Sequence, residues 1–137
     1  MILTKTTEYA VRVLAYMSKE KNQLLSAKYL HEQLNIPYKY LTRLMTDLAK
    51  SGYLMSVKGR DGGFRIIKDL KEISLANIVQ SVEGMDSFNA CILGFHECSN
   101  ENPCAMHFVW EENKKKLLQT LESTSLSDLN HISIRKY

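Results

Sequence analysis

The chain holds 137 residues with a formal net charge of +3, and 45% of its residues are hydrophobic. A chain of this length is expected to form one domain, and this apolar content excludes a disordered protein. No apolar run approaches the roughly 20 residues of a membrane-spanning helix. The N-terminal segment also lacks the apolar core and cleavage site of a signal peptide. We therefore expect a cytoplasmic protein with no membrane partner.

The first 35 residues predict two helices. Over residues 4–20 the apolar side chains recur at helical spacing, and a threonine near the start can cap the helix. Ser26 opens a second helix, in which Leu30 and Leu34 point inward. The segment 35–37 then forms a turn, with its proline near the first position of a third helix.

Residues 36–67 predict a basic helix followed by a β-hairpin. The apolar stripe of the helix is formed by Leu41, Leu44, Met45 and Leu48, and the opposite face carries Lys39, Thr42, Arg43, Thr46 and Lys50. Gly52 ends the helix, and two strands over 53–58 and 64–67 enclose a glycine-rich turn. Such a helix-turn-helix with a cationic hairpin is the layout of a winged helix, which binds double-stranded DNA.

Positive charge is concentrated in the same region. Residues 1–68 hold 12 Lys and Arg against 5 Asp and Glu, whereas residues 69–137 hold 6 against 10. The segment 36–68 alone holds 7 basic and 2 acidic side chains. Because the charges coincide with the exposed helix face and the hairpin turn, they favour a polyanion partner over an unrelated solvated surface.

The second half of the chain predicts a connecting helix, a loop and one long helix. Ser74 caps a helix that Gly84 ends, and residues 85–101 have no clear period, so they are expected to form a loop. A long helix is expected over 103–123, and the segment 125–132 predicts one more short helix. The long helix has an apolar side formed by Met106, Val109, Trp110, Leu117, Leu118 and Leu121. Pairing with a second copy would bury that side in a homodimer, although packing along its own domain is the alternative.

Three cysteines and a histidine lie close together in the sequence. Cys91, Cys98 and Cys104 are separated by six and five residues, and His107 follows Cys104 by three. With Asn102 as cap and Pro103 as first residue, Cys104 is expected in the first turn of the long helix, where the helix dipole favours its thiolate. Soft thiolates in a loop suit zinc or an iron–sulfur cluster. The absence of CxxC pairs favours the cluster, and three unligated cysteines are the alternative.

These segments together resemble the Rrf-two family of bacterial winged-helix regulators. The resemblance is carried by LTKTTEYAVRVLAYM, NIPYKYLTRLMTDLAKSGYLMSVKGRDGGF, SLANIVQSVEG and CAMHFVW, and it spans nearly the whole chain. It implies a homodimeric DNA-binding protein whose cluster lies in the loop before the dimerisation helix. The state of that cluster is expected to alter the affinity for DNA.

The resemblance also implies the ligands of the cluster. Cys91, Cys98 and Cys104 occupy the thiolate positions, and His107 occupies the position of a histidine ligand in the [2Fe-2S] members. Glu8 stands where the related nitric-oxide sensors place a carboxylate that ligates a [4Fe-4S] cluster from the partner subunit. We favour His107 and a [2Fe-2S] cluster, and we expect an aerobically prepared sample to lose it.

For DNA, the resemblance places Lys39, Tyr40, Thr42 and Arg43 in the major groove, and Lys58 and Arg60 at the wing. Thr42 replaces a glutamate that tunes site preference in a family member. The alternative for Tyr40 is that its ring packs beneath the helix.

The expected fold is thus mainly α with a small β-hairpin, a winged helix-turn-helix plus a long C-terminal dimerisation helix. Its parts are a DNA-binding domain (1–84), a cluster-binding loop (85–102), and a dimerisation helix with its tail (103–137). The expected function is a dimeric transcription regulator that acts as a repressor and senses iron–sulfur, redox or nitric-oxide status. The alternative is a cluster-free regulator that acts by cysteine oxidation or by binding a partner enzyme. No grouping of nucleophile, base and acid predicts an enzyme.

Overall fold

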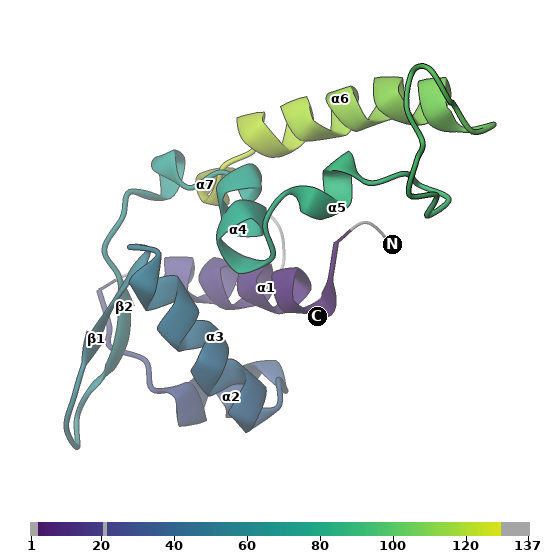
Figure 1. Ribbon diagram of the computed structural model, residues 1–137. Coiled ribbons are helices and arrows are strands. Elements are labelled where there is room, and N and C mark those ends of the chain that lie inside the picture. The colour runs from purple at the N-terminus through teal and green to yellow at the C-terminus, as the bar shows by residue number, and fades with distance from the viewer. Residues whose placement is uncertain (1–2, 21, 130–137) are drawn as a thin grey trace.

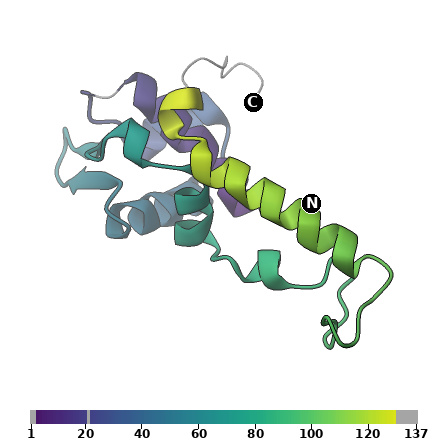
Figure 2. The same cartoon turned by 90° about the horizontal axis from the view of Figure 1, so that it is seen from above.

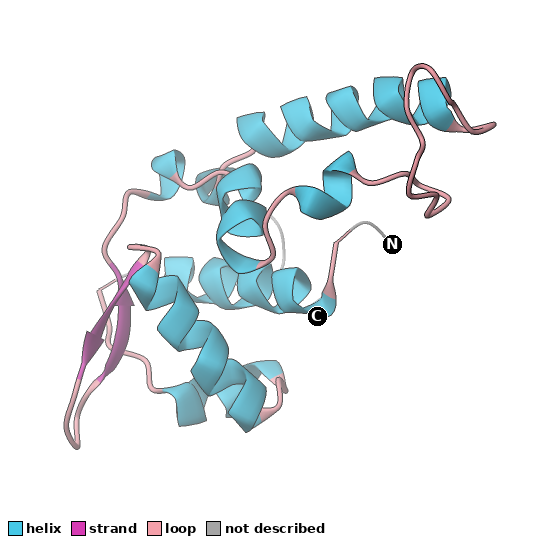
Figure 3. Ribbon diagram, viewed as in Figure 1, coloured by secondary structure: helices cyan, strands magenta, loops and turns pink. Residues whose placement is uncertain are grey.

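The computed structural model describes residues 3–20 and 22–129. Helices dominate this part of the chain, and its β-structure is one antiparallel hairpin (Figure 3). The elements in chain order are α1 (Lys5–Lys19), α2 (Ala27–Leu34), α3 (Tyr38–Lys50), β1 (Leu54–Val57), β2 (Gly63–Ile66), the short 3-10 helix η1 (Leu70–Glu72), α4 (Leu75–Val82), α5 (Asp86–Asn89), α6 (His107–Ser123) and α7 (Leu126–Leu129).

The helix-turn-helix consists of α2 and α3. The Ser26 hydroxyl caps α2 by accepting from the backbone N–H of Tyr29 at 3.0 Å. Asn35 ends α2 in the left-handed conformation, with φ of 53°, which an asparagine tolerates better than most residues. The chain therefore turns sharply into α3, which buries its apolar stripe and leaves its basic face exposed.

The hairpin pairs β1 with β2 from Leu54–Ile66 to Val57–Gly63. It is also held against the start of the helix-turn-helix, because Leu25 and Phe64 exchange backbone hydrogen bonds of 2.9 and 2.8 Å. A Cβ at Gly63 would lie 2.8 Å from the Leu25 backbone, so this close approach requires a glycine. The hairpin is thus fixed beside α3 (Figure 1).

The main core lies between α1, α3 and α4. Its side chains include Leu14 of α1, Leu41 and Met45 of α3, and Ile78 of α4, all of which are fully buried. Leu41 and Met45 belong to the apolar stripe that the sequence predicts for the third helix. Burial of the stripes fixes the basic face of α3 outward.

A smaller core joins α6 to the winged helix. It is formed by Val79, Phe88 and Leu121, with Leu117 and Leu118 packed against it. Only the C-terminal part of α6 takes part, so the helix extends away from the domain toward the loop that precedes it (Figure 2). Near its N-terminal end, Phe108 is 62% exposed and Val109 is 55% exposed.

The chain returns to the domain after α6. Leu75 donates its backbone N–H to Thr124 O at 2.9 Å, and Leu126 donates to Ile73 O at 2.7 Å. Ser74 and Ser125 form the antiparallel bridge between these two pairs. The C-terminal end of α6 is thereby attached to the segment between η1 and α4.

The structure confirms the expected mainly helical fold with its hairpin, and it differs from the elements predicted from the sequence in two places. Residues 85–101 are not all loop, since α5 buries Phe88 there. The long helix begins at His107 rather than at 103. The predicted last helix is present as α7, and its expected residues 130–132 lie outside the described residues. No described helix is long and apolar enough to cross a membrane.

Candidate metal centre and nucleic-acid interface

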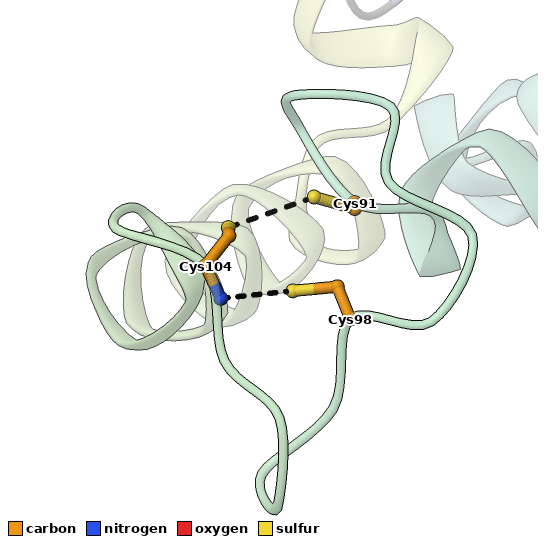
Figure 4. Close-up of side chains that lie close together, drawn as sticks. All are labelled: Cys91, Cys98 and Cys104. Atoms are coloured by element: carbon orange, nitrogen blue, oxygen red, sulfur yellow. Dashed lines mark hydrogen bonds between the residues drawn. The ribbon is translucent and has the colours of Figure 1, made fainter.

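Three cysteines converge in the loop between α5 and α6. Their sulfur atoms all lie within 4.8 Å of one another, although the residues span 91–104 of the chain (Figure 4). The Sγ atoms of Cys91 and Cys104 are 3.7 Å apart, and the backbone N–H of Cys104 donates to Cys98 Sγ at 3.4 Å. This spacing lets the three thiolates bind one metal ion or one cluster together.

Local hydrogen bonds produce the convergence. Ser99 and Asn102 exchange backbone hydrogen bonds of 3.2 Å each, so the chain reverses between Cys98 and Cys104. The Asn102 side chain also donates to Glu97 O at 3.2 Å. At the other end of the loop, Trp110 Nε1 donates to Ala90 O at 3.3 Å, which attaches the residue before Cys91 to α6.

The expected position of Cys104 within the first helical turn is wrong. Because Asn102 is used in the tight turn, it does not cap α6, and Met106 precedes the first helical residue instead. Cys104 therefore lies ahead of the helix. Its backbone N–H donates to Cys98 Sγ and is not one of the N–H groups at the start of α6.

The thiols are not equivalent electrostatically. Burial alone would raise the pKa of Cys91, but backbone amides of Phe95 and Leu93 and the neighbouring thiols lower it to about 7. For Cys98 the backbone amide of Cys104 acts to lower the pKa, yet burial and the neighbouring thiols raise it above its ordinary value. Cys91 is thus the most readily ionised of these two thiols.

His107 lies beside the thiols but reaches only one of them closely. Its Nδ1 is 3.2 Å from Cys98 Sγ, and it is not among the ligand atoms that lie mutually within 4.8 Å. Its Nε2 donates to Asn100 Oδ1 at 2.9 Å. A ring with its proton on Nε2 leaves the Nδ1 lone pair free on the side of the thiols, and a metal ligand requires such a free lone pair.

Glu8 lies in the first turn of α1, where its carboxylate forms an ion pair with Lys5 at 3.2 Å. Lys5 is exposed and Glu8 is half-buried, so part of the Glu8 side chain is accessible to a second copy of the chain. The pair is also what an ordinary acidic residue near a helix N-terminus would form. Its predicted role as a ligand to the cluster of the partner subunit stays a prediction.

The basic residues predicted to bind DNA lie on α3 and on the hairpin turn. Lys39 and Arg43 are exposed on α3, and Lys58 and Arg60 are exposed between β1 and β2. None of the four forms an ion pair with a residue that the structure describes. Their charges are therefore available to a polyanion, and the Thr42 hydroxyl beside them donates to Lys39 O at 2.9 Å.

Tyr40 is turned toward α1. Its hydroxyl hydrogen-bonds the Thr6 hydroxyl, and its ring packs edge-on against Tyr9 with centroids 5.5 Å apart. These contacts favour the alternative in which Tyr40 supports the helix. Tyr38, which the sequence reasoning missed, is instead 51% exposed at the first position of α3. Its spacing of four residues from Thr42 was the available signal, because that spacing puts both on one face.

The two candidate sites lie at opposite ends of the molecule. In Figure 1 the hairpin and α3 are at lower left, and the loop before α6 is at upper right; Figure 2 shows the same separation from above. Any influence of the loop on the basic surface must therefore pass through the elements between them.

Comparisons with known proteins match most of the chain. A family model described as "Rrf2: Iron-dependent Transcriptional regulator" matches residues 3–131. The HTH-type transcriptional regulator NsrR of Shouchella clausii is 33% identical over 139 residues, which cover 94% of this chain and 88% of that protein.

Two solved structures share the fold. CymR, the global cysteine regulator of B. subtilis, has a TM-score of 0.78 and 20% identity, with 96% of this chain and 97% of that chain covered. IscR of T. potens has a TM-score of 0.74 and 23% identity, with 98% and 90% covered.

Proposed function

Because the chain belongs to the Rrf2 family of transcriptional regulators, we propose that it is a dimeric DNA-binding repressor controlled by an iron–sulfur cluster. Like its named relatives, it is a regulator and not an enzyme. The observation that carries the proposal is the convergence of three thiols within 4.8 Å in one loop. The cluster would report iron–sulfur, redox or nitric-oxide status.

The DNA-binding surface of the proposal is α3 with the hairpin turn. Lys39 and Arg43 enter the major groove, where a guanidinium can bind a guanine edge in a bidentate manner. Lys58 and Arg60 reach the backbone and minor groove, because they stand at the tip of a hairpin fixed beside α3. These cations form no ion pair with any described residue, which supports the assignment, since each phosphate contact would release counterions.

A homodimer would cover the exposed part of α6. Phe108 and Val109 are exposed there, as is Met106 just before the helix, although large apolar side chains that lie together normally pack against another surface. Two copies related by a two-fold axis would present two α3 helices to the two halves of a palindromic operator. At the other end of α6, Leu121 packs within its own domain, which is what the alternative to a dimer predicts for the helix.

The donor set fits an iron–sulfur cluster. Cys91, Cys98 and Cys104 would hold it through soft thiolates, which leaves one coordination position. His107 is the favoured fourth ligand because its Nδ1 lies beside Cys98 Sγ, and Glu8 of the partner subunit is its rival. When bound, the cluster supplies a redox-active and oxidant-sensitive centre. We favour a [2Fe-2S] cluster, since a histidine ligand is typical of the members that carry it.

Anaerobic purification with iron and sulfide analysis tests the proposal. The protein should be brown, contain iron and sulfide in equal amounts, and bind a selected duplex with an affinity that changes when the cluster is removed. Cys98→Ala should abolish stable incorporation, whereas Glu101→Ala, an exposed change in the same loop, should not. Colourless protein under strictly anaerobic conditions would refute the cluster.

The fourth ligand is decided by two variants. If His107 is the ligand, His107→Ala changes the visible spectrum and makes the cluster labile, while Glu8→Gln leaves the spectrum unchanged. If Glu8→Gln loses the cluster and His107→Ala keeps a wild-type spectrum, the carboxylate of the partner subunit is the ligand. Size-exclusion chromatography of both variants serves as the control for an intact dimer.

Sensing by cysteine oxidation is the second candidate. It is favoured by the Sγ–Sγ distance of 3.7 Å between Cys91 and Cys104 and by a Cys91 pKa of about 7. A peroxide would take two electrons and two protons from the thiols, which form a disulfide while the peroxide becomes water. A colourless protein that binds DNA and loses that binding upon reversible oxidation would establish this candidate instead.

A further inference from the structure

We propose that Tyr38 is a specificity-determining residue of the DNA interface, and that its ring contacts the 5-methyl group of a thymine in the major groove. The inference rests on the proposed DNA binding. It assigns a base contact to Tyr38, whereas the family resemblance implied that Tyr40 lies in the major groove.

Hydrogen bonding distinguishes Tyr38 from its neighbours. Three tyrosines of the helix-turn-helix have exposed rings, namely Tyr29, Tyr38 and Tyr40. The hydroxyl of Tyr29 pairs with that of Tyr16 at 3.1 Å, and the hydroxyl of Tyr40 pairs with Thr6. The Tyr38 hydroxyl makes no hydrogen bond with a residue that the structure describes. Two of the three hydroxyls are thus paired within the described fold, whereas the Tyr38 side chain keeps a free hydroxyl end and an exposed ring.

The position of Tyr38 suits a base contact. It is the first residue of α3, and the N-terminal residues of a recognition helix are those that contact base edges. Tyr38 shares a face with Thr42 and lies next to Lys39, so it is part of the surface that would enter the groove. Its uncharged ring needs an apolar partner, and the thymine methyl is the apolar group that base edges offer there.

His31 holds the ring in place. Its Nδ1 donates to the carbonyl of Ile36 across the turn between α2 and α3. The imidazole then meets the Tyr38 ring edge-on, with centroids 5.9 Å apart and an interplanar angle of 74°. A ring that is oriented before binding loses less conformational freedom on contact with DNA, which makes the contact more discriminating.

Uracil substitution tests this contact. A duplex is first selected in vitro with the wild-type protein, and each thymine is then replaced singly by deoxyuridine, which removes only the methyl group. Wild-type affinity should fall about four-fold at one position in each half-site, the effect of removing one methyl from an apolar contact. Tyr38→Phe keeps the ring and should keep this loss. Tyr38→Ala should bind thymine and uracil duplexes equally at that position.

Tyr29→Phe is the matched control, and it should retain the wild-type discrimination. Circular dichroism and thermal melting establish that each variant is folded, which is expected because Tyr38 is exposed. Thymine–uracil discrimination that persists in Tyr38→Ala, or that is absent from the wild type at every position, would overturn the assignment. A wild-type protein that selects no duplex would overturn the DNA-binding function itself, so the two failures are distinguishable.

Discussion

Replacement of Phe88 by alanine should destabilise the junction between α6 and the winged helix. Phe88 is fully buried and forms the small core with Val79 and Leu121. At such a buried position, Phe→Ala lowers the free energy of unfolding by about 3–5 kcal/mol. The loss combines the hydrophobic transfer free energy of the removed ring with the cost of the cavity that remains. Since small domains unfold with only about 5–15 kcal/mol, the variant should be marginally stable.

Urea denaturation at fixed protein concentration measures this loss, because the stability of the proposed dimer would depend on concentration. The fluorescence of Trp110, the single tryptophan of the chain, reports on the loop end of α6, and circular dichroism reports on all helices. Phe95→Ala is the control: Phe95 is 60% exposed, so its removal should change stability by no more than about 0.5 kcal/mol. A loss below about 1 kcal/mol for Phe88→Ala would refute the view that this core attaches α6.

Three further predictions concern the hairpin and the thiols. Arg60→Ala should weaken DNA binding and reduce the slope of log affinity against log salt by about 1.8, the contribution of one phosphate contact from each subunit of the proposed dimer, as measured by anisotropy titration. Gly62→Ala should distort the turn, because a Cβ there would lie 2.0 Å from Val57 O, and DNA affinity should fall while the melting of the main core changes little. In cluster-free protein, alkylation of Cys91 should reach half its maximal rate near pH 7, because the thiolate reacts and the fold lowers its pKa to about 7. The same reaction at Cys98 should require higher pH, since its pKa is raised, and equal pH profiles for the two thiols would contradict the assignment.

The sequence predicts the winged helix well because its signals are local. Apolar spacing in α3 predicts which face is buried, and Gly52 and the glycines of 59–63 predict where the helix ends and the hairpin turns. The cysteine spacing likewise predicts that three thiols converge, because a loop of this length can close on itself. Each of these features depends on residues near one another in the chain.

The missed features depend on contacts between distant residues. The helix α5 forms where Phe88 packs against Val79 and Leu121. Residues 85–101 have no apolar periodicity from which that core could be predicted. Asn102 followed by Pro103 is typical of a helix start. In the structure the backbone of Asn102 instead forms hydrogen bonds with the backbone of Ser99, so no helix begins there. Tyr40 is a comparable case, since its orientation is determined by Thr6, which lies 34 residues away in the sequence.

The attachment of α6 at one end gives it the properties of a lever. Its 17 residues span about 25 Å at the rise of an α-helix, and its fixed end lies on the segment that follows the hairpin. A displacement of about 2 Å at the cysteine end would therefore rotate the fixed end by only about 5°. That rotation would act on Ile73 and Leu75, to which the chain after α6 is hydrogen-bonded. A small rearrangement of the thiols can thus reach the segment between η1 and α4, where Ile73 belongs to the main core.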